Sequence, residues 1–526
     1  MKIGRIFLLF VVLTLNSLLL LGQNSRNDVS VQANKLGQTL FYINRLYLDT
    51  ANIENITDQA LVAIMKELDP HSSYISKKDI QAMNEPLQGN FDGIGVEFAL
   101  INDTLTINST IPGGPSEKVG IKAGDKIVAV DGEVISGTGL TIERVHKYLR
   151  GPKGTKVTVS IVRRGMPEQM EFVITRDKIP LNSIDSYYVA EDDIVYLRLT
   201  RFSATSYREM LEALSELGIV PKGIVLDFRG NPGGYLLAAI QIANEFLDKG
   251  QLIVYTEGRS VKRMDEFATG SGVLKNIPVA ILIDENSASA SEIVSGAIQD
   301  WDRGVIIGRR SFGKGLVQQQ IPLQDGSALR LTVARYHTPS GRVIQSPYEE
   351  GKKDEYYMNL VERYNRGENF SRDSIHFADS LMFKTLKEGR TVYGGGGIMP
   401  DIFIAQDTSH YTPFYGEILR KGLLTDYMNE YSDKHRSEIL KKYPSFRSFE
   451  RGFAVSDKDI ADFLAYCASK GVEPKEGDME ISGAEIRRNF KGLIIRSIYS
   501  FNNFIEFLNR EDREVLKAVE VLKGKQ

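Results

Sequence analysis

The sequence predicts a multidomain α/β protein: a core with a largely parallel sheet, an inserted β-rich module, and helical regions before and after them. Three observations predict this. Between about residues 193 and 345, strand-like apolar runs alternate with helical ones, the pattern of parallel strands joined by helices. Between about residues 87 and 165, short β runs are interrupted by glycine. The length of 526 residues suits about three or four domains of roughly 150 residues.

The first 22 residues have the order of a secretory signal. Lys2 and Arg5 precede an apolar run from Ile6 to Leu21, and a polar stretch follows. An uncleaved membrane anchor stays open as the alternative, although this run is shorter than the roughly 20 residues that span a bilayer. We therefore predict a signal peptide at 1–22 and an exported protein of the periplasm or cell envelope. If the signal is kept, residues 6–21 would associate with the membrane.

The spacing of apolar residues predicts the bounds of the β-rich module and of the region before it. Residues 36–86 are predicted to be a helical N-terminal region, because apolar side chains recur at steps of three and four. Within it, residues 69–74 (DPHSSY) are predicted to form a turn. Residues 87–166 are predicted to be a compact β-rich module with one or two helices.

The remaining boundaries follow from the same reasoning. The α/β core is predicted at 180–345, with a return segment at 393–405 after a glycine run. Residues 346–392 are charged and poor in long apolar runs, and we expect an insertion or a mobile segment there. Residues 410–526 are predicted to be a helical, amphipathic C-terminal region.

Composition excludes several classes of function. The net charge is −3, so no basic field is available for phosphate backbones and nucleic acid is not an expected partner. Cys467 is the only cysteine, which rules out an intrachain disulfide and fits a small buried hydrophobe. The six histidines show no H-E-x-x-H spacing, so we expect neither a metal nor another cofactor.

Two clusters in the core could carry chemistry. A serine-rich segment, with Ser287, Ser289 and Ser291, follows the strand 279–284 and opens a helix, which places amides around a hydroxyl. Farther along, Lys314 lies between two glycines after another strand. Serine and lysine can act as nucleophile and base. A helix cap and an exposed turn lysine stay open as the alternatives.

A lysine base sets a physical requirement. With a pKa near 10.4, only about 0.04% of a lysine is neutral at pH 7. The neutral form is thus less stable than the ammonium form by roughly 4.6 kcal/mol at that pH. Burial lowers the pKa of a lysine because it disfavours the charged form. The sequence therefore predicts that Lys314 is buried.

Two other motifs point away from different chemistries. The run from Gly308 to Lys314 resembles a phosphate-binding loop, but Gly315 stands where that loop needs Ser or Thr. Ser311 and Lys314 fit the S-x-x-K pattern of penicillin-recognising enzymes, yet the S-D-N and K-T-G motifs that accompany it are absent. The core also has no G-x-S-x-G motif, which disfavours a hydrolase with a Ser-His-Asp triad. A glycine cluster at 227–234 could supply an oxyanion donor from Gly233 or Gly234, with a tight turn as the alternative.

Several ordered motifs together resemble one family: DPHSSYIS, GIGVEF, LDFRGNPGG, ENSASASEIVSGAIQD, GRRSFGKGLVQQ and YHTPSGRVIQ. Over about residues 36–404 the sequence resembles the carboxy-terminal processing peptidases, also called tail-specific proteases. These are exported serine peptidases with a Ser-Lys dyad. The resemblance implies a crotonase/ClpP-like α/β peptidase core with an inserted PDZ domain at 87–166.

The resemblance also assigns roles to single residues. It implies that Ser289 is the nucleophile, that Lys314 is the general base and that Gln318 orients Lys314. The spacing of four residues suits a helix or turn on which both face one side. The oxyanion donors would be the amides of Ala290 and Gly233.

In the implied PDZ domain, the carboxylate-binding loop would be Gly93, Ile94, Gly95 and Val96, and Arg150 would sense the bound peptide. The expected partners are proteins or peptides with a free, unstructured, apolar C-terminus. Assembly into a homo-oligomer stays open. Two alternatives to an active peptidase also stay open: a catalytically silent exported PDZ scaffold, and a latent protease that a partner activates.

Overall fold

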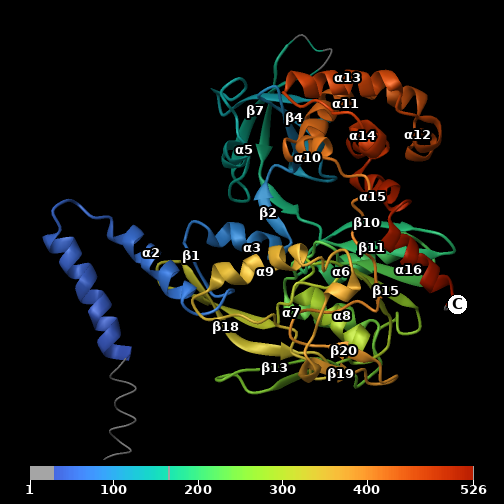
Figure 1. Cartoon of the computed structure of the whole chain (residues 1–526). Coiled ribbons are helices and arrows are strands. Elements are labelled where there is room, and N and C mark those ends of the chain that lie inside the picture. Colours follow the sequence, from blue (N-terminus) through green and yellow to red (C-terminus); the bar gives the residue numbers. More distant parts are fainter. Residues whose placement is uncertain (1–28, 164–165, 167, 525–526) are drawn as a thin grey trace, which may run out of the picture.

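The computed structural model describes residues 29–163, 166 and 168–524. The predicted signal peptide at 1–22, with its apolar run at 6–21, lies outside these residues. Among the residues described, no helix is long and apolar enough to cross a membrane. Figure 1 shows the α/β core in the lower half, with the β-rich module and a group of helices above it.

The centre of the core is a six-stranded sheet in the order β10-β11-β12-β15-β16-β21. The pair β10 and β11 is antiparallel and the other neighbours are parallel, which confirms the predicted α/β core. Strands covered on both faces are expected to be continuously apolar. The bounds are β10 Ile184–Val189, β11 Ile194–Leu199, β12 Gly223–Asp227, β15 Val279–Ile283, β16 Val305–Gly308 and β21 Ile402–Phe403.

Helices from two distant parts of the chain cover the two faces of this sheet. One face packs against α6 (Ser206–Glu216), α7 (Leu236–Asn244) and α8 (Ala290–Asp300). The other face packs against α15 (Phe501–Asn509) and α16 (Arg513–Lys523). The second face is therefore buried only when the C-terminal helices are in place.

A second sheet lies beside the first, in the order β1-β18-β13-β14, with β17 paired to β18. Its strand β1 comes from the N-terminal region, which is otherwise helical: residues 29–46, α2 and α3. The prediction of a turn over 69–74 is therefore wrong for Ser73 and Tyr74, which pair with β18 as part of β1 and join the DPHSSY segment to the core. The bounds are α2 Ile53–Lys66, β1 Ser73–Ile75, α3 Ile80–Gln88, β13 Leu252–Glu257, β14 Met264–Phe267, β17 Leu316–Pro322 and β18 Ala328–His337.

The β-rich module has a five-stranded antiparallel path, β3-β4-β5-β7-β8, with β6 paired to β5. The chain enters and leaves it through a two-stranded ribbon, β2 with β9. The bounds are β2 Asn90–Gly93, β3 Val96–Ile101, β4 Thr104–Thr110, α4 Pro115–Lys118, β5 Lys126–Val130, β6 Glu133–Val134, α5 Ile142–Leu149, β7 Lys156–Val162, β8 Met170–Thr175 and β9 Asp177–Pro180.

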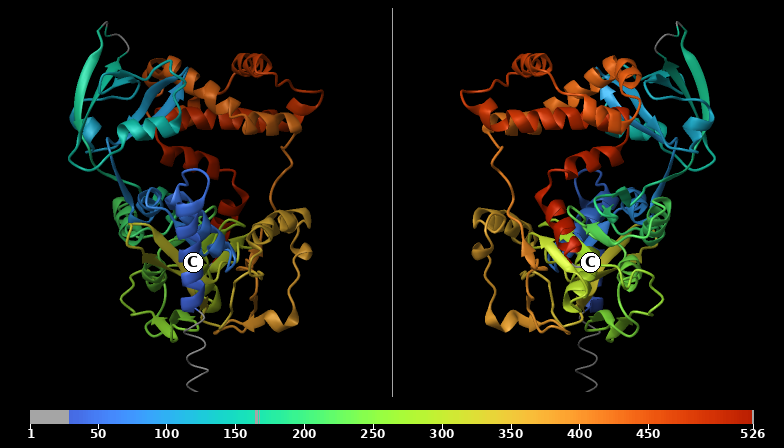
Figure 2. Two further views of the ribbon diagram at one scale, coloured as in Figure 1. Left: turned by 90° about the vertical axis from the view of Figure 1, so that its left-hand side faces the viewer. Right: turned by 90° about the vertical axis from the view of Figure 1, so that its right-hand side faces the viewer.

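The charged segment after β18 contains α9 (Lys353–Asn365), two 3₁₀ turns (Arg372–Ser374 and Asp379–Leu381) and the hairpin β19 (Met382–Lys384) with β20 (Thr391–Tyr393). Five helices then form a helical module beside the β-rich module, and α15 and α16 lead back to the core (Figure 2). The helices of this module are α10 Pro413–Arg420, α11 Leu423–Lys442, α12 Phe446–Gly452, α13 Asp457–Ser469 and α14 Asp478–Ile498.

Candidate active site

Ser289 lies at the junction between the central strand β15 and helix α8. Its φ of 55° and ψ of −111° belong to a conformation that non-glycine residues rarely adopt. Such strain persists only where the surrounding structure imposes it, and it is concentrated at functional sites. Helix α8 is buried along its length, so the junction is held firmly.

The three serines of the cluster differ in what their hydroxyls do. Ser287 Oγ donates to the carbonyl of Phe228 at 2.8 Å, and Ser291 Oγ donates to the carbonyl of Asn231 at 3.0 Å. These two side chains fasten α8 to the glycine-rich loop after β12. Ser289 instead forms a capping box with Glu292 at the start of α8, in which its hydroxyl oxygen accepts from a backbone amide and its own O–H proton is not used.

Glu292 joins the Ser289 junction to the Lys314 loop. Its side chain is fully buried and accepts from the amides of Ser289 (2.7 Å), Gly313 (2.8 Å) and Lys314 (2.9 Å), and from the Ser311 hydroxyl (2.6 Å). Burial raises the pKa of Glu292 to about 7, although these hydrogen bonds oppose the rise. One carboxylate thus fixes the backbone on both sides of the site.

Tyr336 on β18 makes a second link between the same two segments. Its buried hydroxyl lies within hydrogen-bond distance of the carbonyl oxygens of Lys314 and of Ser289, the latter at 3.2 Å. The hydroxyl can donate its proton to only one of them at a time. Glu292 binds the amides and Tyr336 binds the carbonyls, so the structure brings the two predicted dyad segments together.

Lys314 has the environment that a lysine base needs. Burial lowers the pKa of Lys314 and the nearby Arg330 guanidinium lowers it further, while Glu292 and Asp69 raise it. Its amine makes no hydrogen bond or ion pair with the other residues of the described ranges. Both features favour the neutral amine over the ammonium ion.

The DPHSSY turn lies on the Lys314 side of the site. Burial lowers the pKa of His71 to about 3, and the charge of Lys314 lowers it as well. The His71 ring meets the edge of Tyr356 at a centroid distance of 5.3 Å, and its Nε2 is buried without a partner in the described part of the chain. His71 is therefore neutral at pH 7 and contributes no charge to the site.

Helix α9, which lies in the segment 346–392 that was expected to be an insertion, packs against the Lys314 loop. On α9, Arg363 donates to the carbonyl of Ser311 at 3.0 Å, and the Tyr356 hydroxyl donates to the carbonyl of Gly313 at 3.3 Å. Residues 353–365 thus pack against the loop that carries the lysine, although their composition gave no sign of it.

Gln318 lies on strand β17, so the expectation that it shares a helix or turn with Lys314 is wrong. The register between β17 and β18 shifts just before it. Its amide nitrogen donates to the carbonyl of Leu316 at 3.2 Å and to Thr332 Oγ1 at 3.3 Å, and Thr332 donates to Asp69 at 2.9 Å. The structure thus connects Gln318 to the DPHSSY turn and not to the Lys314 amine.

The predicted oxyanion donors lie next to Ser289. The Ala290 amide begins α8 and has no acceptor in the described ranges, as an oxyanion donor requires. Gly233 packs so closely that a Cβ on it would lie 2.7 Å from the Ser289 Cβ. However, the Gly233 amide donates to Asn231 Oδ1 at 2.9 Å, so it must break that bond to reach a substrate.

The predicted peptide-binding residues line a cavity of about 80 Å³ between β3 and α5. The carbonyl of Ile94 accepts from Ser116 and that of Gly95 accepts from Ile111, whereas the Ile94 and Gly95 amides have no acceptor in the described part of the chain. The residues lining the cavity are Phe91, Gly93, Ile94, Gly95, Val96, Phe98, Val145, His146, Leu149 and Arg150.

Arg150 at the rim of this cavity is already engaged. It forms an ion pair with Glu85 of α3 at 2.7 Å, and its guanidinium lies over the Phe91 ring at 4.5 Å. Glu85 was not predicted from the sequence, because it lies 65 positions away on another element. Within the described ranges, no group of three or more His, Cys, Asp or Glu side chains could hold a metal ion.

The partly buried side chains of Ser289 and Lys314, which follow strands of one parallel sheet, are the groups that a serine-type peptidase would use. The family description "Peptidase family S41" matches residues 193–351, "PDZ domain" matches 106–163, and a family of unknown function matches 414–500. The chain is 38% identical to a carboxy-terminal-processing protease of Bartonella bacilliformis over 61% of its own length and 74% of the relative.

A probable CtpA-like serine protease of Staphylococcus aureus is 34% identical over 59% of the chain and 62% of that relative. A photosystem II D1 C-terminal processing protease is a structural match, with TM-score 0.35 and 26% identity over 70% of this chain and 86% of that one. The chain belongs to the carboxy-terminal-processing proteases of peptidase family S41.

Proposed function

We propose that this protein is an exported endopeptidase that cleaves proteins with unstructured, apolar C-termini by means of a Ser289-Lys314 dyad. The observation that carries the proposal is the double link between Ser289 and Lys314 through Glu292 and Tyr336. The partly buried amine of Lys314 supports it, because desolvation lowers the pKa of Lys314 and makes a neutral base accessible.

In the proposed reaction, the neutral amine of Lys314 accepts the proton of the Ser289 hydroxyl as Oγ attacks the scissile carbonyl carbon. The negative charge that develops on the carbonyl oxygen would be stabilised by the amides of Ala290 and Gly233. Lys314 then gives the proton to the leaving amine, and an acyl-enzyme forms. Water, activated by the same amine, hydrolyses the ester and restores Ser289.

Recognition of the substrate is proposed to occur in the cavity between β3 and α5. The free amides of Ile94 and Gly95 can bind a terminal carboxylate while the peptide extends along β3. Val96 completes the loop, and Gly93 lets the backbone approach. Arg150 would then exchange Glu85 for the bound peptide.

Export is proposed from the order of residues 1–22, which places the enzyme in the periplasm or cell envelope. Cleavage of the signal would release the enzyme, and retention would anchor it through residues 6–21. Fractionation of cells that produce the full chain, followed by N-terminal sequencing of the mature protein, tests both points. A protein found in the cytoplasm with Met1 intact would contradict the proposal.

A latent protease that a partner activates is the second candidate. Two contacts favour it: Gly233 donates its amide to Asn231, and Gln318 binds Thr332 instead of Lys314. In that state, one oxyanion donor and the predicted orienting residue are both engaged elsewhere.

Cleavage of a disordered polypeptide with an apolar C-terminus, followed by mass spectrometry, tests the dyad. Wild type should cleave it, and Ser289→Ala and Lys314→Ala should not. Ser469→Ala and Lys470→Ala, exposed in the helical module, are matched controls and should cleave normally. Cleavage by Ser289→Ala would refute the assignment. Cleavage by none of the five proteins would favour the latent enzyme over the active one.

A further inference from the structure

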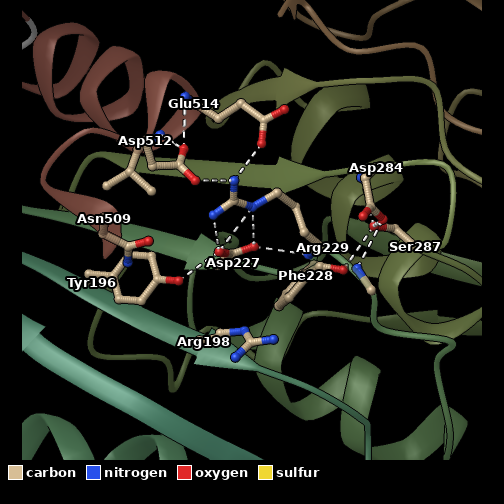
Figure 3. Close-up of polar contacts among 12 residues, drawn as sticks. Tyr196, Arg198, Asp227, Phe228, Arg229, Asp284, Ser287, Asn509, Asp512 and Glu514 are labelled. Atoms are coloured by element: carbon tan, nitrogen blue, oxygen red, sulfur yellow. Dashed lines mark hydrogen bonds and ion pairs between the residues drawn. The ribbon is translucent and has the colours of Figure 1, made fainter. Parts of the chain in front are cut away.

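The start of helix α16 carries two acidic side chains that reach the edge of the central sheet where the active-site loops begin. Asp512 is the N-cap of the helix and accepts from the amides of Glu514 and Val515. Glu514 is only 6% exposed. A buried carboxylate needs charged partners, and two arginines supply them (Figure 3 shows the first).

Arg229 follows β12, the strand that leads into the glycine-rich loop. Its guanidinium binds Asp227 at 2.6 Å on its own strand, and it also binds Asp512 at 2.8 Å and Glu514 at 2.5 Å. Four residues farther on, Gly233 lies against Ser289. The next residue after the arginine, Gly230, donates its amide to Asp284 at 2.9 Å, at the end of the strand that carries the nucleophile.

Arg309 follows β16, the strand that leads into the Lys314 loop. It binds Glu514 at 2.6 Å and Glu285 at 2.9 Å. Glu285 lies four residues before Ser289. Glu514 therefore forms ion pairs with one arginine that follows β12 and one that follows β16. These two strands are the neighbours in the sheet of β15, the strand that leads to Ser289.

The acidic end of α16 is a fixed point because the rest of the helix is anchored. Its apolar side chains pack on the sheet face formed by alternate residues of the same strands. The members of this cluster on α16 are Val515, Ala518, Val519 and Leu522, and those on the sheet are Ile194, Tyr196, Val225, Ala280, Leu282 and Ile307. Movement of the carboxylates away from the arginines would require this packing to open.

We propose that Glu514, assisted by Asp512, is a positioning residue for peptide cleavage: through Arg229 and Arg309 it fixes the loops that carry Gly233, Ser289 and Lys314. This inference rests on the proposed Ser-Lys function. It gives the helix α16, outside the segment that matches the peptidase family, a direct part in the geometry of the site.

Three full-length mature variants test the proposal. Glu514→Gln and Asp512→Asn each remove one charge with little change of shape, and asparagine caps a helix as well as aspartate does. Glu520→Gln is the matched control, because Glu520 is exposed on the same helix and pairs with Lys517. Steady-state cleavage gives kcat and KM for each protein.

We expect Glu514→Gln to lower kcat by about 10- to 100-fold, because small displacements of reacting groups have effects of this size. KM should change by less than about twofold, since the peptide-binding module is untouched. Asp512→Asn should have a smaller effect of the same kind, and Glu520→Gln none. A Glu514→Gln enzyme with wild-type kcat would overturn the proposal, as would a loss confined to KM.

A second measurement separates this proposal from the failure of the dyad itself. Amide hydrogen exchange of residues 228–234 and 284–290 is compared between Ser289→Ala and Ser289→Ala/Glu514→Gln, neither of which needs to cleave. Faster exchange in these two segments, with unchanged exchange in α13, supports the proposal even if the dyad is wrong. Equal exchange in both segments contradicts it, and faster exchange throughout the chain would show general destabilisation and contradict it as well.

Discussion

The main-chain amides of Ser289 and Lys314 donate to the same oxygen atom, Oε2 of Glu292, at 2.7 and 2.9 Å. The two residues are 25 positions apart and begin different connections from the sheet. A single acceptor atom thus sets the spacing between the proposed nucleophile and the proposed base. Disruption of this acceptor should change the site without touching either side chain.

Replacement of Glu292 by Gln should destabilise the protein and abolish cleavage. The new amide group would face N–H and O–H donors and leave at least one of them buried without an acceptor, which costs roughly 1–3 kcal/mol for each donor. Urea unfolding followed by circular dichroism measures the loss. As a control, Glu438→Gln changes an exposed residue of α11 and should unfold at the wild-type urea concentration. Wild-type stability and activity in Glu292→Gln would contradict this account.

Replacement of Arg330 by Met should move the pH dependence of cleavage to higher pH. The positive charge of Arg330 lowers the pKa of Lys314, so its removal favours the ammonium form and raises that pKa. Because the neutral amine is the active form, the rising limb of log(kcat/KM) against pH shifts in the alkaline direction. Arg335→Met on the same strand is the control, since Arg335 is not among the charges that shift Lys314. A shift toward lower pH would contradict the proposed base.

Replacement of Gly233 by Ala should abolish cleavage and destabilise the fold. The φ of 97° is unfavourable for alanine, and the new Cβ would lie 2.7 Å from the carbonyl oxygen of Ala288 and from the Ser289 Cβ. Gly218→Ala separates the two effects, because Gly218 has a φ of 65° but open space around it. That control should lose only about 1–2 kcal/mol and keep its activity. Normal cleavage by Gly233→Ala would show that this glycine does not face the reacting serine.

Replacement of Glu85 by Gln should tighten the binding of peptides with a free carboxylate. Glu85 occupies Arg150 at 2.7 Å, so a peptide carboxylate that binds Arg150 must first displace it. We expect about a two- to tenfold lower Kd in fluorescence anisotropy, a modest change because the ion pair is partly exposed. Arg150→Ala should weaken binding, and a C-terminally amidated peptide should not respond to either change. Equal affinities for the two peptides would argue against carboxylate recognition.

The sequence predicted the parts of the site that depend on local order. Ser289 and Lys314 each follow an apolar strand, and neighbouring parallel strands present their carboxyl ends at one edge, so their proximity could be expected. Glu292 had a local signal as well, since Ser followed by Glu three positions later is a helix-start pattern. The chemistry of a lysine base predicted a buried Lys314; the side chain is partly buried, and this desolvation lowers the pKa of its amine.

The other contacts have no local signal. Tyr336, Asp69 and Glu514 reach the site from separate strands, turns and helices, and only the folded chain brings them near it. Gln318 shows the opposite case: its spacing from Lys314 suited a helix or turn, but the pairing of β17 with β18 made the segment a strand. Tertiary pairing decided the local structure there.

The ion pair between Arg229 and Asp512 joins residues 283 positions apart. A chain that emerges from the ribosome or through a membrane from its N-terminus has its serine and lysine in place long before α16 arrives. Until then, one face of the central sheet lacks its cover, and the core cannot finish folding. We therefore expect the site to be assembled only after α15 and α16 have been delivered, so a nascent chain that lacks them should not cleave.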